Sequence, residues 1–358
     1  MFQVIQIFLF CAAIAIALFY FFFLSIRPFL YFRGVTISRF LEKCSFPTSA
    51  FSPNPVLAFF RTGVFQTLAS AAIAVQPPPT DREVILTSSG GIALDWVLPS
   101  YPDLSATGVL VILSHGLLGR GCVNAMHDLA IRARSAGSLV VLVQPPGVAG
   151  TEGVAGVGFK LSAELQAVSE KISERVGSHV PKILIAFSIA SIPALSFLPN
   201  SSFAAAALIC APIEDLSKIL MKRNVATDEF VSAGKIFLRN NGEFATRKWA
   251  DLIQPALKSE TVADFAREFS DKALGRSELA PINDADVLQM PTLFLYALDD
   301  PWISFDSVDL LRLIRNENVA VAVTEQGGHC GFLAGFGSRR WVNTAILEFV
   351  EAAIRPVI

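Results

Sequence analysis

Short, continuous runs of apolar residues recur through most of the chain, and longer segments with helical spacing of apolar residues lie between them. Continuous apolar runs are typical of strands buried on both faces of a parallel sheet, and the segments between them are long enough for crossover helices. The pattern therefore predicts an α/β fold with a mainly parallel sheet and helices on both faces. The eight predicted strands are EVILT, IALDWVL, VLVILSH, LVVLVQP, KILIAFS, AAALICA, TLFLYAL and VAVAVTE.

Several segments between the strands have the apolar spacing of amphipathic helices. Residues 213–290 break the alternation, because they carry most of the mid-chain Lys, Arg and Glu residues in helix-like stretches between the sixth and seventh strands. We expect these residues to form a helical cap inserted into the sheet domain. The predicted helices of the sheet domain cover residues 126–136, 161–176, 189–198, 305–315 and 341–353.

The N-terminal part of the chain has a different pattern, because residues 4–26 carry no charged side chain. A helix of this length crosses the roughly 30 Å of hydrocarbon in a bilayer. A cleaved signal peptide is the alternative, but the stretch has no basic residue before it and no small-x-small cleavage site after it. The sequence therefore predicts a transmembrane helix that acts as an uncleaved signal-anchor and attaches the chain to a membrane.

Basic residues follow this apolar stretch and none precedes it, which by the positive-inside rule places the rest of the chain in the cytosol. We expect a single-pass membrane protein of the endoplasmic reticulum or another endomembrane. The basic residues that follow are Arg27, Arg33, Arg39 and Lys43.

The chain divides into three parts on this pattern. Residues 1–30 form the predicted transmembrane anchor, residues 31–80 a juxtamembrane helical segment, and residues 81–358 the sheet domain with its cap. Within the second part, residues 56–75 are apolar with polar interruptions and end before three prolines. This spacing predicts an amphipathic helix packed on the domain or on the membrane surface.

Charge and cysteine content exclude several classes of protein. The chain has 29 Lys plus Arg residues and 31 Asp plus Glu residues, a formal charge of −2. It therefore lacks the excess of positive charge that is typical of nucleic-acid-binding proteins. The five cysteines are scattered without CxxC spacing, which predicts neither a disulfide framework nor a zinc site. We expect most of them to be buried as small apolar side chains.

Ser188 lies where the predicted strand over residues 182–187 gives way to a helical stretch. A serine at such a turn is typical of a nucleophile elbow, which presents the hydroxyl above the sheet. The usual motif is Gly-x-Ser-x-Gly, because the turn leaves little room for side chains at the glycine positions. Here these positions hold Ala186 and Ala190, which are also small. The segment predicts Ser188 as a nucleophile with a degenerate elbow.

One of the four histidines lies where such a nucleophile needs a base. His329 belongs to the sequence GGHCGF, directly after the last predicted strand. A loop at this edge of the sheet can bring the imidazole to Ser188, so we predict that His329 is the general base. A histidine that only forms hydrogen bonds within a turn is the alternative.

Two adjacent acids, Asp299 and Asp300, follow the seventh predicted strand. The resulting chain order of serine, acid and histidine is the order found in α/β-hydrolases. Counting along the strand end favours Asp300, three residues after Ala297. Asp299 stays the alternative acid, because adjacent side chains point in different directions and a one-residue slip reverses the choice.

The oxyanion hole of such a site takes one backbone N–H from the residue after the nucleophile and one from the loop after the third strand. These residues are Ile189 and Leu117, and we expect His115 to brace the second loop rather than exchange protons. The predicted chemistry is ester hydrolysis through an acyl-serine intermediate. The sequence has no HExxH, P-loop or strand-to-helix GxGxxG motif, so neither a metal nor a cofactor is predicted.

Taken together, these segments resemble the membrane-anchored α/β-hydrolase-domain lipases of the AB hydrolase 4 family, particularly its phospholipase-like members. The resemblance runs nearly end to end. The most specific segments are the apolar N-terminal run, GVFQT at residues 63–67, GG at 90–91, LDW at 94–96, HGL at 115–117, GVAG at 147–150, DDP at 299–301 and GGHCGF at 327–332.

The resemblance implies an α/β-hydrolase fold and hydrolysis of acyl esters in glycerolipids or phospholipids, with short-chain esters or acyl transfer to alcohols in some members. The chain departs from the family at the elbow, where GxSxGG is replaced by Ala186, Ala190 and Ser191, and at Pro146, where the family usually has Arg. The HxxxxD sequence sometimes associated with acyl transfer is absent.

The predicted function is therefore a serine esterase or lipase that cleaves carboxylic acyl esters, with a lipid or ester as its partner. Two alternatives stay open. The altered elbow is compatible with a catalytically weak pseudo-hydrolase that binds a lipid or protein partner, and the family resemblance is compatible with an acyltransferase. The sequence makes no prediction about the oligomeric state.

Overall fold

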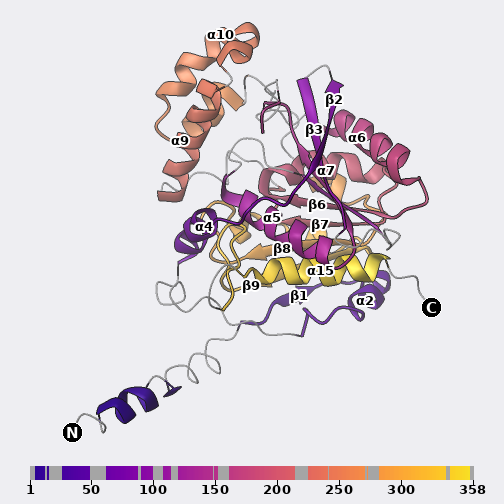
Figure 1. The fold of residues 1–358 in the computed structure, drawn as a ribbon, viewed down its shortest axis with the longest axis vertical. Coiled ribbons are helices and arrows are strands. Elements are labelled where there is room, and N and C mark those ends of the chain that lie inside the picture. Colours follow the sequence, from indigo (N-terminus) through magenta and orange to yellow (C-terminus); the bar gives the residue numbers. More distant parts are fainter. Residues whose placement is uncertain are drawn as a thin grey trace.

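The protein contains one large, mostly parallel sheet with helices on both faces (Figure 1). The computed structural model describes residues 5–12, 14–15, 26–48, 62–87, 90–99, 108–113, 120–147, 149–151, 161–213, 225–240, 242–270, 272, 282–335 and 339–354. The nine strands of the sheet lie in the order β1-β9-β8-β7-β6-β4-β5-β3-β2. Their bounds are β1 Phe29–Tyr31, β2 Asp81–Thr87, β3 Gly90–Val97, β4 Val109–Leu113, β5 Leu139–Gln144, β6 Lys182–Phe187, β7 Ala205–Ile209, β8 Thr292–Ala297 and β9 Val319–Thr324.

All six strands from β4 to β9 run parallel, and antiparallel strands close the two edges of the sheet. The parallel strands are buried along nearly their whole length, which explains their continuous apolar sequences. Strand β4 shows the two-sided burial: Val109, Val111 and Leu113 pack in one core cluster. Leu110 and Ile112 pack in the other.

The prediction of eight strands is wrong by one. Each of the eight predicted strands is present, but β1 adds a ninth strand at the sheet edge, antiparallel to β9 with Leu30 opposite Ala322. The reason is that β1 is short and follows the apolar run of residues 4–26, so its sequence does not stand out from that run. Its strand conformation depends on pairing with β9, which is distant in sequence.

Helices from different parts of the chain cover the two faces. Helices α2 (Val35–Leu41), α5 (Arg120–Ser135) and α15 (Trp341–Ile354) pack on one face, and α6 (Leu161–Val176) and α7 (Ser191–Phe197) on the other (Figure 1). The predicted helices over 161–176 and 341–353 agree with α6 and α15. The helix predicted over 126–136 begins earlier, at Arg120.

The predicted helix over residues 305–315 is wrong, because two short pieces are present, η6 (Phe305–Ser307) and α14 (Leu310–Leu313). Val308 has an extended backbone between them. Asp309 then caps α14 by accepting a hydrogen bond from the Arg312 N–H at 3.0 Å. This capping favours a new helix start over continuation of the first turn.

The described part of the predicted cap is mainly helical. It contains α9 (Val225–Asn240), α10 (Gly242–Lys258), α11 (Val262–Phe265), η4 (Ala266–Ser270) and α13 (Ile282–Ala285). Helices α9 and α10 form a unit beside the end of the sheet (Figure 1).

The helix predicted within residues 56–75 is α4 (Gly63–Ala72), and residues 49–61 lie outside the described part of the chain. In the predicted transmembrane segment, residues 5–12 and 14–15 are helical, and the others up to residue 25 lie outside the described part. Across the residues that the structure describes, no helix combines the length and the apolar character needed to span a bilayer.

Candidate active site

Ser188 occupies a strained turn at the carboxyl end of β6. Its φ angle is +55°, in the left-handed region that non-glycine residues adopt at a cost of about 1–2 kcal/mol. The 3₁₀ turn η2 (Ser188–Ala190) and helix α7 follow at once. Such a turn projects a serine hydroxyl from the edge of the sheet, which is the geometry of a nucleophile elbow.

The two alanines of the elbow fit this turn without a glycine. Ala186 lies in the core at the end of β6, and Ala190 has φ −63° and ψ −16°, an ordinary helical conformation. Pro193 falls in the first turn of α7, where its missing N–H would have no helical acceptor. The departures from the strict motif therefore leave the backbone of Ser188 in the elbow conformation.

Three side chains predicted from the sequence form one chain of hydrogen bonds. The Oγ atom of Ser188 lies 2.7 Å from Nε2 of His329. Nδ1 of His329 lies 2.8 Å from Oδ2 and 3.1 Å from Oδ1 of Asp300. The side chains of His329 and Asp300 are only 1% exposed, so water does not compete for their hydrogen bonds.

The carboxylate of Asp300 is itself fixed by the backbone. Its Oδ1 accepts hydrogen bonds from the N–H groups of Trp302 at 2.8 Å and Ile303 at 2.9 Å. The Trp302 ring packs against the His329 ring, with 4.4 Å between the ring centroids. These contacts hold both the acid and the plane of the imidazole.

Burial and charge act in opposite directions on His329. Burial lowers the pKa of His329, but the charge of Asp300 and its hydrogen bond to Nδ1 together outweigh burial, and the pKa lies above its ordinary value. The site therefore stabilises the imidazolium that forms when Nε2 takes a proton from Ser188.

Asp299, the alternative acid, contacts the histidine loop through its backbone. Its Oδ1 accepts hydrogen bonds from the N–H groups of Gly327 at 2.9 Å and Gly328 at 2.8 Å. Among the described residues, its buried Oδ2 has no hydrogen-bond partner. Burial raises the pKa of Asp299 to about 6. The structure thus places Asp300 on the imidazole and Asp299 on the loop.

This shift in pKa predicts a pH dependence of stability. Because the pKa of Asp299 is about 6 in the folded protein against 3.8 for an unperturbed group, the folded state binds more protons between these values. The contribution of Asp299 to stability is therefore fully present below pH 3.8 and is lost as the pH rises through about 6. Urea unfolding at several pH values should show this pH-dependent loss of stability in the wild type and not in Asp299→Asn. An equal pH dependence in the two proteins would contradict a raised pKa of Asp299.

Only one of the two predicted oxyanion donors can be placed. Ile189 directly follows the nucleophile in η2, so its N–H belongs to the first turn after Ser188. Leu117 lies outside the described residues, as does His115.

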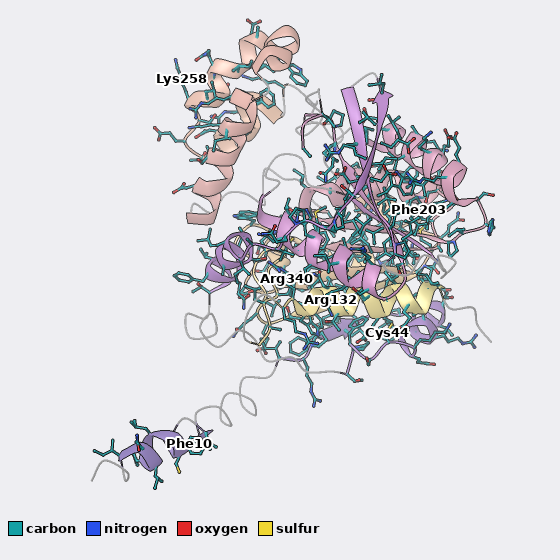
Figure 2. The ribbon with its side chains drawn as sticks, viewed as in Figure 1. Phe10, Cys44, Arg132, Phe203, Lys258 and Arg340 are labelled. Carbon is teal, nitrogen blue, oxygen red and sulfur yellow. The ribbon has the colours of Figure 1, made fainter. Side chains whose placement is uncertain are left out.

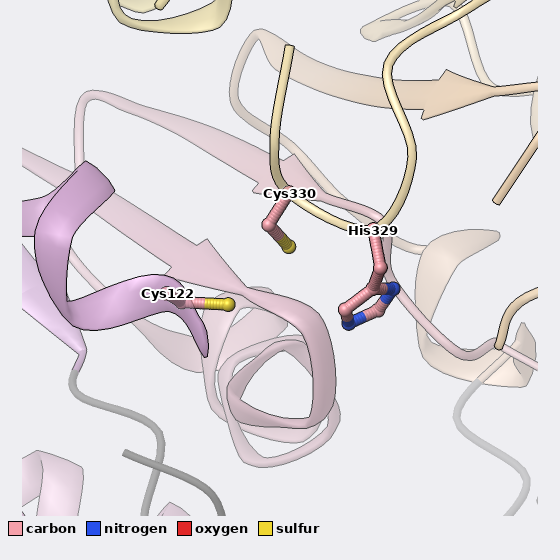
Figure 3. A group of neighbouring side chains, drawn as sticks. All are labelled: Cys122, His329 and Cys330. Carbon is pink, nitrogen blue, oxygen red and sulfur yellow. The ribbon is translucent and has the colours of Figure 1, made fainter. Parts of the chain in front are cut away.

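Three buried cysteines surround the histidine, a convergence that sequence reasoning missed. Cys122 lies in the first turn of α5 and Cys330 follows His329 (Figure 3). Cys210 follows β7. Burial raises the pKa of the Cys210 thiol to about 11, so this thiol stays protonated at neutral pH. The spacing of the three cysteines along the chain does not predict that they cluster, because each one comes from a different element.

Within the described part of the chain, two groups of side chains have the donors for a metal ion. The ligand atoms of Cys122, His329 and Cys330 lie within 4.8 Å of one another, as do those of Cys210, Asp300 and His329. Both groups share His329, whose two ring nitrogens already contact Asp300 and Ser188. A cation would therefore have to displace one of these hydrogen-bond partners.

The fold and the site together define a class of protein. A nucleophilic serine in a strained turn after a central parallel strand, an acid after β8 and a histidine after β9 are the elements of a serine hydrolase on the α/β-hydrolase fold.

Comparison with known proteins supports this class. The chain is 25% identical over 370 residues to phospholipase ABHD3 of Bos taurus, covering 96% of this chain and 88% of that protein. It is 23% identical over 374 residues to phospholipase ABHD3 of Homo sapiens, with the same coverage. An abhydrolase domain-containing protein of Dictyostelium discoideum is 23% identical over 76% of this chain and 74% of its own length. No protein-family model matches the chain.

Solved structures show the same fold at low sequence identity. An esterase of Pyrococcus furiosus aligns with a TM-score of 0.50 and 14% identity, over 80% of this chain and 93% of its own. A membrane phospholipase A described as a bacterial virulence factor aligns with a TM-score of 0.50 and 12% identity, over 99% of this chain and 100% of its own. The chain therefore has the α/β-hydrolase fold, carries the triad of a serine hydrolase and is similar to phospholipases over nearly its whole length.

Proposed function

We propose that this protein hydrolyses carboxylic acyl esters of glycerolipids, and of phospholipids in particular, with Ser188 as nucleophile, His329 as general base and Asp300 as orienting acid. The observation that carries the proposal is the continuous chain of hydrogen bonds from Asp300 through His329 to Ser188. The lipid substrate class is supported by the similarity to phospholipases over nearly the whole chain.

The reaction has two steps. His329 Nε2 accepts the hydroxyl proton as Ser188 Oγ attacks the ester carbonyl, and the N–H groups of Ile189 and Leu117 stabilise the tetrahedral oxyanion. When the intermediate collapses, Nε2 donates this proton to the departing alcohol and the acyl group stays on Ser188. Water then attacks the acyl-enzyme with His329 again as base, which releases a carboxylic acid and restores the serine.

We also propose that residues 4–26 anchor the protein in an endomembrane with the catalytic domain in the cytosol. The helical residues 5–12 expose large apolar side chains, among them Ile7, Phe8 and Phe10. Exposed apolar side chains of this size favour transfer into lipid. The basic residues that follow favour the cytosolic side by the positive-inside rule.

Of the alternatives, a binding-only pseudo-hydrolase loses its main support. It was motivated by the alanines of the elbow, and Ala190 has an ordinary helical backbone beside a nucleophile that contacts its base. Acyl transfer uses the same acyl-enzyme with an alcohol in place of water, so it is tested in the same experiment.

The test is release of fatty acid from vesicles of phosphatidylcholine by the full-length protein, with Ser188→Ala protein as the blank. We expect fatty acid and lysophospholipid to appear in equal amounts. If an added alcohol acceptor yields more ester than free acid, the protein is an acyltransferase. If wild type does not exceed the blank with phosphatidylcholine, triacylglycerol or a short-chain ester, the proposed hydrolase function is wrong.

A further inference from the structure

Helix α4 precedes β2 in the chain, far from His329 in the sequence, yet it packs directly against the loop that carries His329. We propose that α4 is part of the active site and that Thr67 is the residue that positions the backbone of His329. This inference rests on the proposed function of the triad. It assigns a role to the GVFQT segment, which the hydrolytic mechanism itself does not use.

The histidine loop, residues 327–333, needs external support because its backbone is strained. Cys330 and Phe332 have φ angles of +58° and +45°, in the left-handed region that residues with a Cβ atom adopt at a cost. Strained backbone of this kind persists only where surrounding contacts hold it, and it clusters at active sites. The contacts of the loop N–H groups therefore decide where His329 lies.

The N–H groups of this loop donate hydrogen bonds to residues of three different segments. The Asp299 carboxylate accepts hydrogen bonds from the N–H groups of Gly327 and Gly328. The N–H of His329 donates to the Thr67 hydroxyl, and the N–H of Cys330 donates to the Cys210 sulfur. The N–H of Leu333 donates to the Gln66 side chain. Thr67 and Gln66 both belong to α4. The helix therefore fixes the loop at the histidine itself and again four residues later.

Thr67 is suited to this role by the orientation of its hydroxyl. Its side chain is buried, the residue being 3% exposed. The hydroxyl donates to the carbonyl of Gly63 at 2.7 Å, and its oxygen accepts from the His329 N–H at 2.8 Å. Because the proton points to Gly63, a lone pair is left to face His329. Thr67 thus holds the backbone of His329 while Asp300 holds the ring, and Nε2 is left facing Ser188.

The glycines of the two segments explain how α4 approaches so closely. A Cβ atom at Gly63 would overlap the carbonyl of Asp299, and one at Gly328 would overlap the carbonyl of Gly63. A Cβ atom at Gly331 would lie 2.8 Å from the carbonyl oxygen of Gln66, closer than real Cβ atoms come. Gly63 is therefore required by the contact of α4 with Asp299, and Gly328 and Gly331 are required by the contact of the histidine loop with α4.

Further contacts fix the other end of α4. Arg340, labelled in Figure 2, lies directly before α15. Its guanidinium donates to the Ser70 hydroxyl at 3.3 Å and to the Ser70 carbonyl at 3.0 Å. The side chain of Asn124 donates to the Ala71 carbonyl at 2.9 Å. Asn124 of α5 and Arg340 therefore hold the end of α4 that follows Thr67.

The test compares Thr67→Val and Thr67→Ser in the full-length protein, with Thr292→Val as the matched control. Valine has the shape of threonine but cannot accept from the His329 N–H, whereas serine can. We expect Thr67→Val to lower kcat for ester hydrolysis by roughly ten- to a hundredfold with KM within about twofold. Thr67→Ser should recover most of the rate.

Thr292 lies at the start of β8, is fully buried, and its hydroxyl donates to the Met290 carbonyl at 3.0 Å. Removing this hydroxyl should lower Tm and leave kcat at the wild-type value. A wild-type kcat in Thr67→Val, or an equal loss of kcat in Thr292→Val, would overturn the proposal.

The rate at which a fluorophosphonate labels Ser188 gives a second readout that depends on the activated serine and not on the choice of ester. If wild type labels but cleaves no ester, the proposed function fails, and the labelling rates of the three variants still test the role of Thr67. Labelling of Thr67→Val at the wild-type rate would then overturn it.

Discussion

Replacing Ser188 with alanine is expected to lower kcat for ester hydrolysis by roughly a factor of 10⁴ to 10⁶ and to abolish fluorophosphonate labelling. The reason is that Oγ lies 2.7 Å from His329 Nε2, and no acyl-enzyme forms without it. The fold should be retained, because alanine adopts the same left-handed backbone at a similar cost. Activity against vesicles, labelling and Tm are the three measurements.

Ser191 provides the matched control for this substitution. It is fully buried in the first turn of α7, and its hydroxyl donates to the Ala186 carbonyl at 3.4 Å rather than to the histidine. Ser191→Ala should therefore keep the wild-type labelling rate. Labelling that persists in Ser188→Ala, or disappears in Ser191→Ala, would show that the nucleophile has been assigned to the wrong residue.

The two adjacent acids should differ sharply when each is replaced by asparagine. Asp300→Asn is expected to lower kcat by about 10⁴, because an amide in contact with Nδ1 favours the wrong tautomer of His329. Asp299→Asn is expected to lower kcat by less than about tenfold, since the amide oxygen can still accept from Gly327 and Gly328. Initial rates at pH about 7.5, with the amount of folded protein matched, measure the difference.

This comparison is informative because each variant is the control for the other. The substitutions are identical and adjacent, so a general loss of stability would affect both. Equal losses of kcat, or a larger loss in Asp299→Asn, would contradict the assignment of Asp300 as the residue that orients His329.

Local patterns in the sequence were sufficient to predict much of the candidate active site. The continuous apolar runs of β4 to β9 follow from burial on both faces, and each predicted strand is present. Because parallel strands end at the same edge of a sheet, the positions of Ser188, Asp300 and His329 after their strands were sufficient to expect them near one another. The choice of Asp300 over Asp299 depended on counting within one strand end.

Features that depend on contacts between distant segments were not predicted. Strand β1 exists because it pairs with β9, and the break between η6 and α14 depends on the capping by Asp309. The cysteine cluster and the contact of α4 with the histidine loop each join segments that are far apart in the chain.

The sequence by itself therefore determined the fold class and the order of the catalytic residues, because periodicity and strand ends are local properties of the chain. Only the tertiary structure decided which carboxylate reaches the imidazole and which supports the loop. Adjacent side chains point in different directions, and the sequence pattern does not show which of the two faces His329. It also decided that a glycine and a threonine of α4 contact the loop of His329. That contact depends on the packing of two segments that are more than 250 residues apart in the chain.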